Sequence, residues 1–91
     1  MDTQHLSALL DLAETTEDGP WKLLKDERTL TLHAASGGVS LNVGKVCKVR
    51  TEGKLLFAEN VVGETFVLEL ESVFAGAVAP SGKESRKAGF R

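Results

Sequence analysis

The chain has 91 residues, of which 42% are hydrophobic and 26% are charged, and its formal net charge is −2. These values are ordinary for one globular domain with a small core. No apolar run approaches the ~20 residues of a membrane-spanning helix. Asp2 stands where a secretion signal would carry a basic residue, so we expect neither membrane association nor secretion. Cys47 is the only cysteine, which excludes an internal disulfide and favours a reducing, cytoplasmic location.

Charge is distributed unevenly along the sequence. Residues 1–20 hold five carboxylates and no lysine or arginine, whereas residues 80–91 hold four basic side chains and one glutamate. Pro80 and the Gly, Ser and Lys content after it predict a globular domain over residues 1–79 and a flexible basic tail over 80–91. The two ends could attract each other within or between copies. Exposed ion pairs contribute only about 0–1 kcal/mol each, so two solvated ends are the simpler interpretation.

Residues 3–14 are predicted to form a helix. Asp2 or Thr3 can cap its first turn, and Gly19-Pro20 ends any continuation. One face of this helix is apolar, and it consists of Leu6, Leu9, Leu10 and Ala13. A helix of about 12 residues is marginal alone, so this face is expected to dock on the rest of the domain.

The next part of the chain alternates between apolar and polar residues, which is typical of strands with one buried face. The predicted strands are residues 21–24, 29–34, 39–43 and 46–51. Trp21 is expected to fill one end of the core. Ser36-Gly37-Gly38 predicts a turn, and Gly44 predicts a bend or bulge. Cys47 and Val49 are expected on one face, with Lys48 and Arg50 on the other.

Three further runs follow a hairpin turn at residues 51–54. They cover residues 55–57, 65–71 and 73–78. The resulting sheet should enclose the apolar side chains of one face, which are Leu30, Leu32, Leu41, Val49, Phe66, Leu68 and Leu70.

One helix followed by six or seven short strands predicts a mainly β fold, a small antiparallel β-barrel or roll with one N-terminal α-helix. A bent middle strand over residues 39–50 would help such a sheet to close. The layout over residues 3–79, with a short turn at Glu71-Ser72 before the last strand, resembles small barrels of the SH3-like and Sm-like kind. No binding motif of those domains is matched, so no site residue follows from the resemblance.

Catalytic constellations are weak. Cys47 and His33 are expected on opposite faces, and His5, His33 and Cys47 lack the spacing of a structural zinc site. Glu69 and Glu71 would lie about 6.6–6.8 Å apart along a strand, which overlaps the range of inverting glycosidases. Alternating glutamates on a solvated strand are far commoner than active sites. We therefore expect no enzyme, no metal and no cofactor.

Basic residues provide one candidate function, nucleic-acid binding. The candidate contacts are Lys45, Lys48, Arg50, Lys54, Lys83, Arg86, Lys87 and Arg91. The acidic overall charge and the small number of aromatic residues argue against it.

Protein association is the function that the sequence favours. Residues 73–78 carry no charge and predict an apolar edge strand, with Val73, Phe74 and Val78 as the candidate association surface. The sheet is expected to carry apolar residues on both of its faces, and the residues that indicate this are Val46, Val61, Val62 and Val67. The predicted function is a non-enzymatic module that binds itself or an unidentified protein, with nucleic-acid binding as the alternative.

Overall fold

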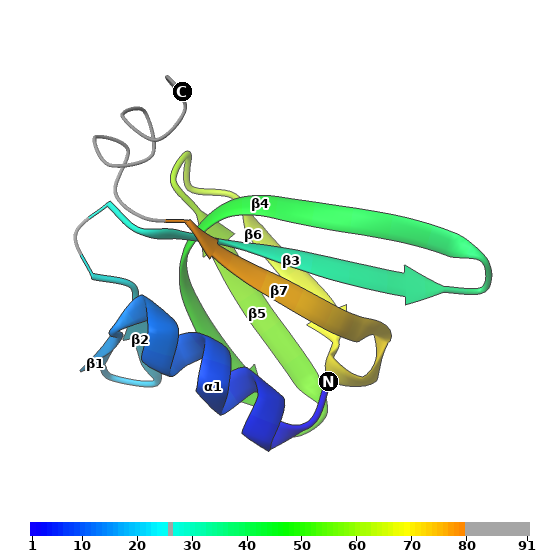
Figure 1. The fold of residues 1–91 in the computed structure, drawn as a ribbon, viewed down its shortest axis with the longest axis horizontal. Coiled ribbons are helices and arrows are strands. Elements are labelled where there is room, and N and C mark those ends of the chain that lie inside the picture. The colour runs from blue at the N-terminus through cyan, green and yellow to red at the C-terminus, as the bar shows by residue number, and fades with distance from the viewer. Residues whose placement is uncertain (26, 80–91) are drawn as a thin grey trace, which may run out of the picture.

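The computed structural model describes residues 1–25 and 27–79, and it contains one helix and seven strands in a single antiparallel sheet (Figure 1). The elements in chain order are α1 (Thr3–Ala13), β1 (Thr16–Asp18), β2 (Trp21–Leu23), β3 (Thr29–Ser36), β4 (Val39–Glu52), β5 (Leu55–Asn60), β6 (Thr65–Glu69), the 3-10 helix η1 (Leu70–Ser72) and β7 (Val73–Ala79). The predicted mainly β fold with one N-terminal helix is confirmed. None of the described helices combines the length and the apolar character that crossing a membrane requires.

The helix α1 begins directly after its N-cap residue, Asp2. The side chain of Asp2 accepts a hydrogen bond of 2.8 Å from the backbone N–H of His5. The helix ends at Ala13, one residue earlier than expected, because Glu14 adopts a left-handed conformation with φ of 54°. Leu6, Leu9 and Ala13 are buried, so the predicted apolar face is the one that packs.

The strand β1 was missed by the sequence analysis. Its three residues are all exposed and polar, so they carry no alternation that could mark a strand. β1 pairs with β2 in a hairpin that turns at Gly19-Pro20, with Asp18 opposite Trp21. Glu17 and Asp18, two of the five carboxylates in residues 1–20, therefore lie in a strand.

The bent strand β4 organises the sheet. β3 and then β2 pair along one edge of β4, and β5 pairs along the other. The bend lies at Lys45, whose φ is 57°, one residue after the glycine that predicted it. The register between β3 and β4 shifts at the same place, since Leu32 pairs with Val43 but Leu30 pairs with Val46.

The sheet does not close into a barrel. β7 pairs with β3 and β6 pairs with β5, but β6 and β7 do not pair with each other. α1 lies over the inner side of the sheet next to β7 (Figure 1). A Cβ atom at Gly76 would stand only 2.6 Å from Cδ1 of Leu9, so the missing side chain is what allows helix and strand to approach.

The core agrees with most of the predicted interior. The fully buried large side chains are Leu30, Leu32, Val43, Val46, Val49, Leu56 and Val73. Phe66, Leu68 and Leu70 are partly buried and pack against them. Leu41 is a correction, since 47% of it is exposed. Val46 is another, because the bend turns it inward from the outer face on which it was expected.

Trp21 does not fill the end of the core. It is half-buried and lies outside the core cluster, beneath the cationic groups of Lys48 and Arg50. Cys47 is half-buried as well, and its thiol donates to the carbonyl of Glu59. Because Val46 and Val49 both point inward, simple alternation does not hold across this part of β4.

Candidate association surface

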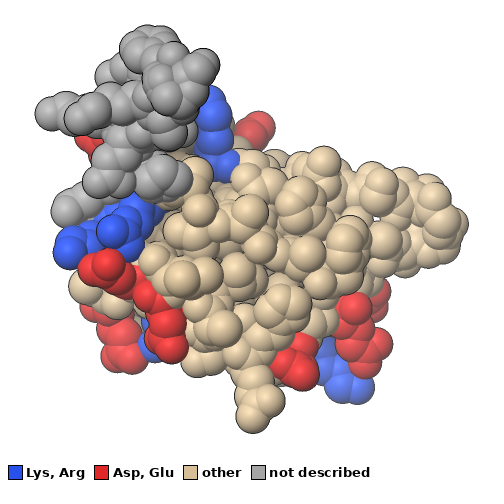
Figure 2. Space-filling view, viewed as in Figure 1, with Lys and Arg blue, Asp and Glu red and all other residues tan. Residues whose placement is uncertain are grey.

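The outer side of β7, β3 and the neighbouring part of β4 forms a surface without charged side chains. The register brings together Thr31 with Ala77, and His33 with both Ala75 and Asn42. We call this the uncharged face, and its residues are Thr29, Thr31, His33, Ala35, Ser40, Asn42, Phe74, Ala75 and Ala77. Figure 2 views this side of the molecule and shows charged residues only around its borders.

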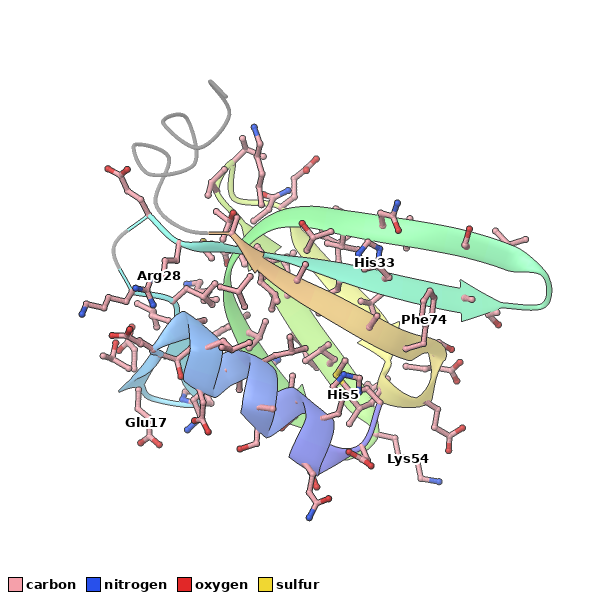
Figure 3. All side chains as sticks on the ribbon, in the orientation of Figure 1. His5, Glu17, Arg28, His33, Lys54 and Phe74 are labelled. Atoms are coloured by element: carbon pink, nitrogen blue, oxygen red, sulfur yellow. The ribbon has the colours of Figure 1, made fainter. Side chains whose placement is uncertain are left out.

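Phe74 is the largest hydrophobe on the uncharged face, and 58% of it is exposed. Its ring centroid lies 6.2 Å from that of His33, and the two side chains stand next to each other on β7 and β3 (Figure 3). Nδ1 of His33 lies 2.7 Å from Oδ1 of Asn42. In this small cluster, the exposed ring of Phe74 stands beside the polar side chains of His33 and Asn42, on a face whose other residues are small.

The second feature is the free edge of β7. Among the described residues, β7 pairs only with β3, so the backbone groups on its other edge have no strand partner. A groove of about 430 Å³ runs beside this edge. Leu9 and Leu12 of α1 line one side of it, and Gly76, Ala77 and Val78 line the other.

Glu14 and Arg28 line the groove at the C-terminal end of α1, and Lys25 pairs with Glu14 there. Nη1 of Arg28 donates to the carbonyl of Leu12 at 3.2 Å and to the carboxylate of Glu14 at 2.9 Å, and Nζ of Lys25 lies 3.1 Å from the same carboxylate. These hydrogen bonds from Lys25 and Arg28 lower the pKa of Glu14 below its usual value. Positive charge at this helix end also suits the macrodipole.

The predicted association residues differ in exposure. Phe74 is exposed and Val78 is half-buried at the groove, but Val73 is completely buried in the core. Val73 therefore cannot form part of a surface, because it is the inward residue that follows η1. No local feature of the sequence indicates that the alternation of this strand starts with an inward residue at position 73.

The tip of the β3–β4 hairpin is a further exposed apolar region. We call residues 35–42 the arm; all eight are exposed, and the arm extends beyond the rest of the molecule (Figure 1). Val39 is 70% exposed although it faces the inner side of the sheet. A second groove, of about 320 Å³, runs between the arm and the residues Val67, Leu68, Glu69 and Ser72.

The predicted nucleic-acid contacts do not gather in one place. Lys45 lies at the bend before the β4–β5 pairing and Lys54 lies in the turn at its far end, so about 20 Å of paired strand separates them. Lys83, Arg86, Lys87 and Arg91 lie outside the described residues, as does the predicted tail.

Lys48 and Arg50 do come together, over aromatic rings. The guanidinium carbon of Arg50 lies 3.7 Å from the centroid of Phe57 and 5.4 Å from that of Trp21, and Nζ of Lys48 lies 4.9 Å from the centroid of Trp21. Each cation also has a carboxylate. Lys48 pairs with Glu59 at 3.7 Å and Arg50 with Glu52 at 2.9 Å. The cluster is therefore close to neutral.

The candidate metal ligands lie apart from one another in the part of the chain that the structure describes. Within residues 1–25 and 27–79, no three His, Cys, Asp or Glu side chains are grouped as metal ligands would be. Glu69 ends β6 and Glu71 belongs to η1, so the strand spacing expected for this pair does not apply.

Comparisons with protein-family models, with curated proteins and with solved structures each find no significant match.

Proposed function

We propose that this protein is a non-enzymatic interaction module that associates with itself through β7. The observation that carries the proposal is the uncharged edge of β7 beside the uncharged face, an edge that has no strand partner within residues 1–25 and 27–79. Edge strands of soluble proteins are commonly protected by charged side chains, prolines or a covering element. Val73–Ala79 contains no charged residue and no proline.

The composition of β7 supports strand-to-strand contact. Ala75, Gly76 and Ala77 present small side chains, so a second strand can approach at the 4.7–4.9 Å or so that sheet pairing requires. The irregularity in β7 lies between Val73 and Ala75, which leaves the pairing of Ala75–Ala79 with β3 regular. The half of β7 that borders the groove is thus the half best suited to pairing.

Light scattering coupled to size-exclusion chromatography tests this proposal. We expect the mass to exceed that of one 9.7 kDa chain and to rise with concentration. Ala77→Asp places a carboxylate on the edge and should return the protein to a monomer. Val62→Asp is the matched control, because Val62 is 75% exposed in the turn between β5 and β6. A wild-type protein that stays monomeric at every concentration would overturn the proposal.

The cellular setting that we propose is the cytoplasm. Cys47 is a free thiol, half-buried and hydrogen-bonded to a backbone carbonyl. A reducing compartment keeps such a thiol from forming disulfides between copies.

Nucleic-acid binding is the second candidate. The stacked arrangement of Arg50 between Phe57 and Trp21 favours it, since arginine and aromatic side chains are the groups on which bases stack. Glu52 and Glu59 oppose it, because phosphates would meet carboxylates beside each cation. Titration with single-stranded RNA and duplex DNA at low salt decides the matter. Affinity that falls with salt, and falls further in Arg50→Ala, would support binding.

A further inference from the structure

The groove of about 320 Å³ beside the arm runs along the edge of β6. Val67, Leu68 and Glu69 line it in consecutive positions. Successive residues of a strand face opposite sides of a sheet, so three consecutive lining residues place the groove at the edge of their strand. Among the described residues β6 pairs with β5 alone, and this edge is therefore the one that lacks a strand partner.

The opposite wall of the groove is the part of β3 that β7 does not reach. β7 pairs with β3 only as far as Ala34, which lies opposite Val73. The wall consists of residues at this end of β3 and on the arm, which are Ala34, Ala35, Ser36, Val39 and Leu41. An extended segment in the groove would thus meet the free edge of β6 on one side and an apolar wall on the other.

The largest apolar side chains of the groove are accessible. The exposed fractions are 70% for Val39, 54% for Val67 and 47% for Leu41. Val39 and Leu41 come from the arm and Val67 comes from β6, so a bulky apolar side chain between them would bury surface on both walls at once. Such burial stabilises a complex by roughly 25 cal/mol for each Å² of apolar surface removed from water.

Acidic residues gather at one end of the groove. Glu69 lines the groove and also a smaller neighbouring opening, which Glu71 lines as well. Both glutamates are exposed, and in the described part of the chain neither takes part in an ion pair. Lys54 lines the smaller opening, but residues 61–72 hold three glutamates and no lysine or arginine. This charge favours a basic segment over an acidic one.

We propose that the groove binds an extended segment of a partner protein that carries a bulky apolar side chain and, two positions away, a lysine or arginine. The segment would add a strand to the free edge of β6, where backbone hydrogen bonds supply affinity and side chains supply specificity. Val67 and Glu69 lie on the same face of β6, two residues apart. The residues opposite them on an added strand are therefore also two apart, the apolar one beside Val67 and the basic one beside Glu69.

This site goes beyond the proposed self-association and does not depend on it. Self-association is proposed to use the edge of β7, whereas the peptide site uses the edge of β6 and the inner side of the arm. A protein that stays monomeric can therefore still bind the segment.

Fluorescence anisotropy with the full chain and a labelled peptide, Thr-Lys-Thr-Phe-Thr-Lys-Thr, tests the proposal. The peptide has a lysine two positions from its phenylalanine in both directions, so it suits a parallel or an antiparallel strand. We expect saturable binding that weakens as salt is added, because exposed charges are screened. The same peptide with glutamate in place of lysine should not bind.

Two variants of the groove and two matched controls locate the site. Glu69→Gln combined with Glu71→Gln should weaken binding by about tenfold, since each exposed ion pair contributes up to about 1 kcal/mol. Val67→Ser should weaken binding as well. Asp11→Asn combined with Asp18→Asn, and Val62→Ser, change exposed residues elsewhere and should leave the affinity unchanged. Thermal melting checks that each variant folds.

Amide hydrogen exchange with the peptide bound tests the strand addition. Exchange should slow at the amides of Thr65–Glu69 that face away from β5 and stay unchanged in β7. No binding, equal binding of the acidic peptide, equal affinity in the groove variants, or unchanged exchange in β6 would each overturn the proposal.

Two further results would assign the groove to another occupant and overturn the proposal. One is tighter binding, by about tenfold, in a full chain with Lys83→Gln, Arg86→Gln, Lys87→Gln and Arg91→Gln, because the chain's own basic residues would then compete for the groove. The other is loss of self-association in Val67→Ser, because a second copy would then occupy it.

Discussion

The β3–β4 hairpin has two parts, the arm (residues 35–42) and the remainder, which we call the body. Both parts are built from the same two strands, but other elements cover only the body. In the body, Leu30, Leu32, Val43 and Val46 face inward and are fully buried in the core cluster, which includes Leu6 and Leu9 of α1 and Leu56 of β5. In the arm, Val39 and Leu41 face the same side of the sheet, and both are exposed. Period-two patterning therefore specifies which face a residue occupies, whereas burial depends on whether another element reaches that far.

Substituting leucines on the two parts should give the largest contrast. Leu32→Ala removes a fully buried side chain and should lower the free energy of unfolding by about 2–5 kcal/mol. Leu41→Ala should change it by less than about 0.5 kcal/mol, because the side chain is half exposed in the monomer. Urea denaturation followed by circular dichroism measures both. Equal losses would mean that the arm is covered in solution.

Two glycines outside the arm, Gly76 of β7 and Gly44 of β4, provide the next contrast. Gly76→Ala forces its Cβ toward Leu9 of α1, so the helix side chain must shift at a cost of about 1 kcal/mol. Gly44→Ala is the control, because its Cβ would meet nothing closer than Oγ1 of Thr31 at 3.9 Å. Thermal denaturation should lower the melting temperature in the first variant alone. A harmless Gly76→Ala would show that α1 does not pack tightly on β7.

The outer face of the body carries the cationic cluster that the arm lacks. Arg50→Met keeps the length of the side chain and removes its charge from the rings of Trp21 and Phe57. We expect a loss of about 0.5–1 kcal/mol and a change in the emission of Trp21, the only tryptophan. Lys54→Met, in the β4–β5 turn, should leave the emission unchanged. An identical spectrum in both variants would contradict the stacking.

The smallest effect concerns Glu14, whose pKa is lowered by its hydrogen bonds to Lys25 and Arg28. Because folding lowers this pKa, the stabilisation is complete above the usual value of 4.5 and is lost as pH falls through the lower folded value. Glu14→Gln should lower the melting temperature slightly at pH 7 and not at all near pH 3. A difference that persists at low pH would point to a cause other than this charge.

The sequence predicted the positions of the helix and strands more accurately than it predicted which of their side chains are buried by other elements. Alternation and turn residues located the helix, six of the seven strands and the bend near Gly44, because these signals are local. Leu41 was misplaced because no local signal reports how far β5 and α1 extend. Val46 was misplaced because the bend at Lys45 reverses the parity of β4. β1 was missed because it is entirely polar.

The candidate surface was predicted in part for the same reason. The uncharged composition of residues 73–78 is visible in the sequence, and it singled out Phe74, which the structure places on the surface. The groove beside β7 was not visible, since Leu12 lies on α1 and Val78 on β7, more than sixty residues later. Likewise, nothing local could show that Lys48 and Arg50 would stack on Trp21 and be neutralised by Glu52 and Glu59.

Amide hydrogen exchange at two protein concentrations tests the central claim, pairing through the edge of β7, most directly. Raising the concentration should slow exchange at the β7 amides that face away from β3, within Ala75–Ala79, and leave the amides of residues 35–42 unchanged. Exchange in β7 that does not depend on concentration, or slowing confined to the arm, would contradict it.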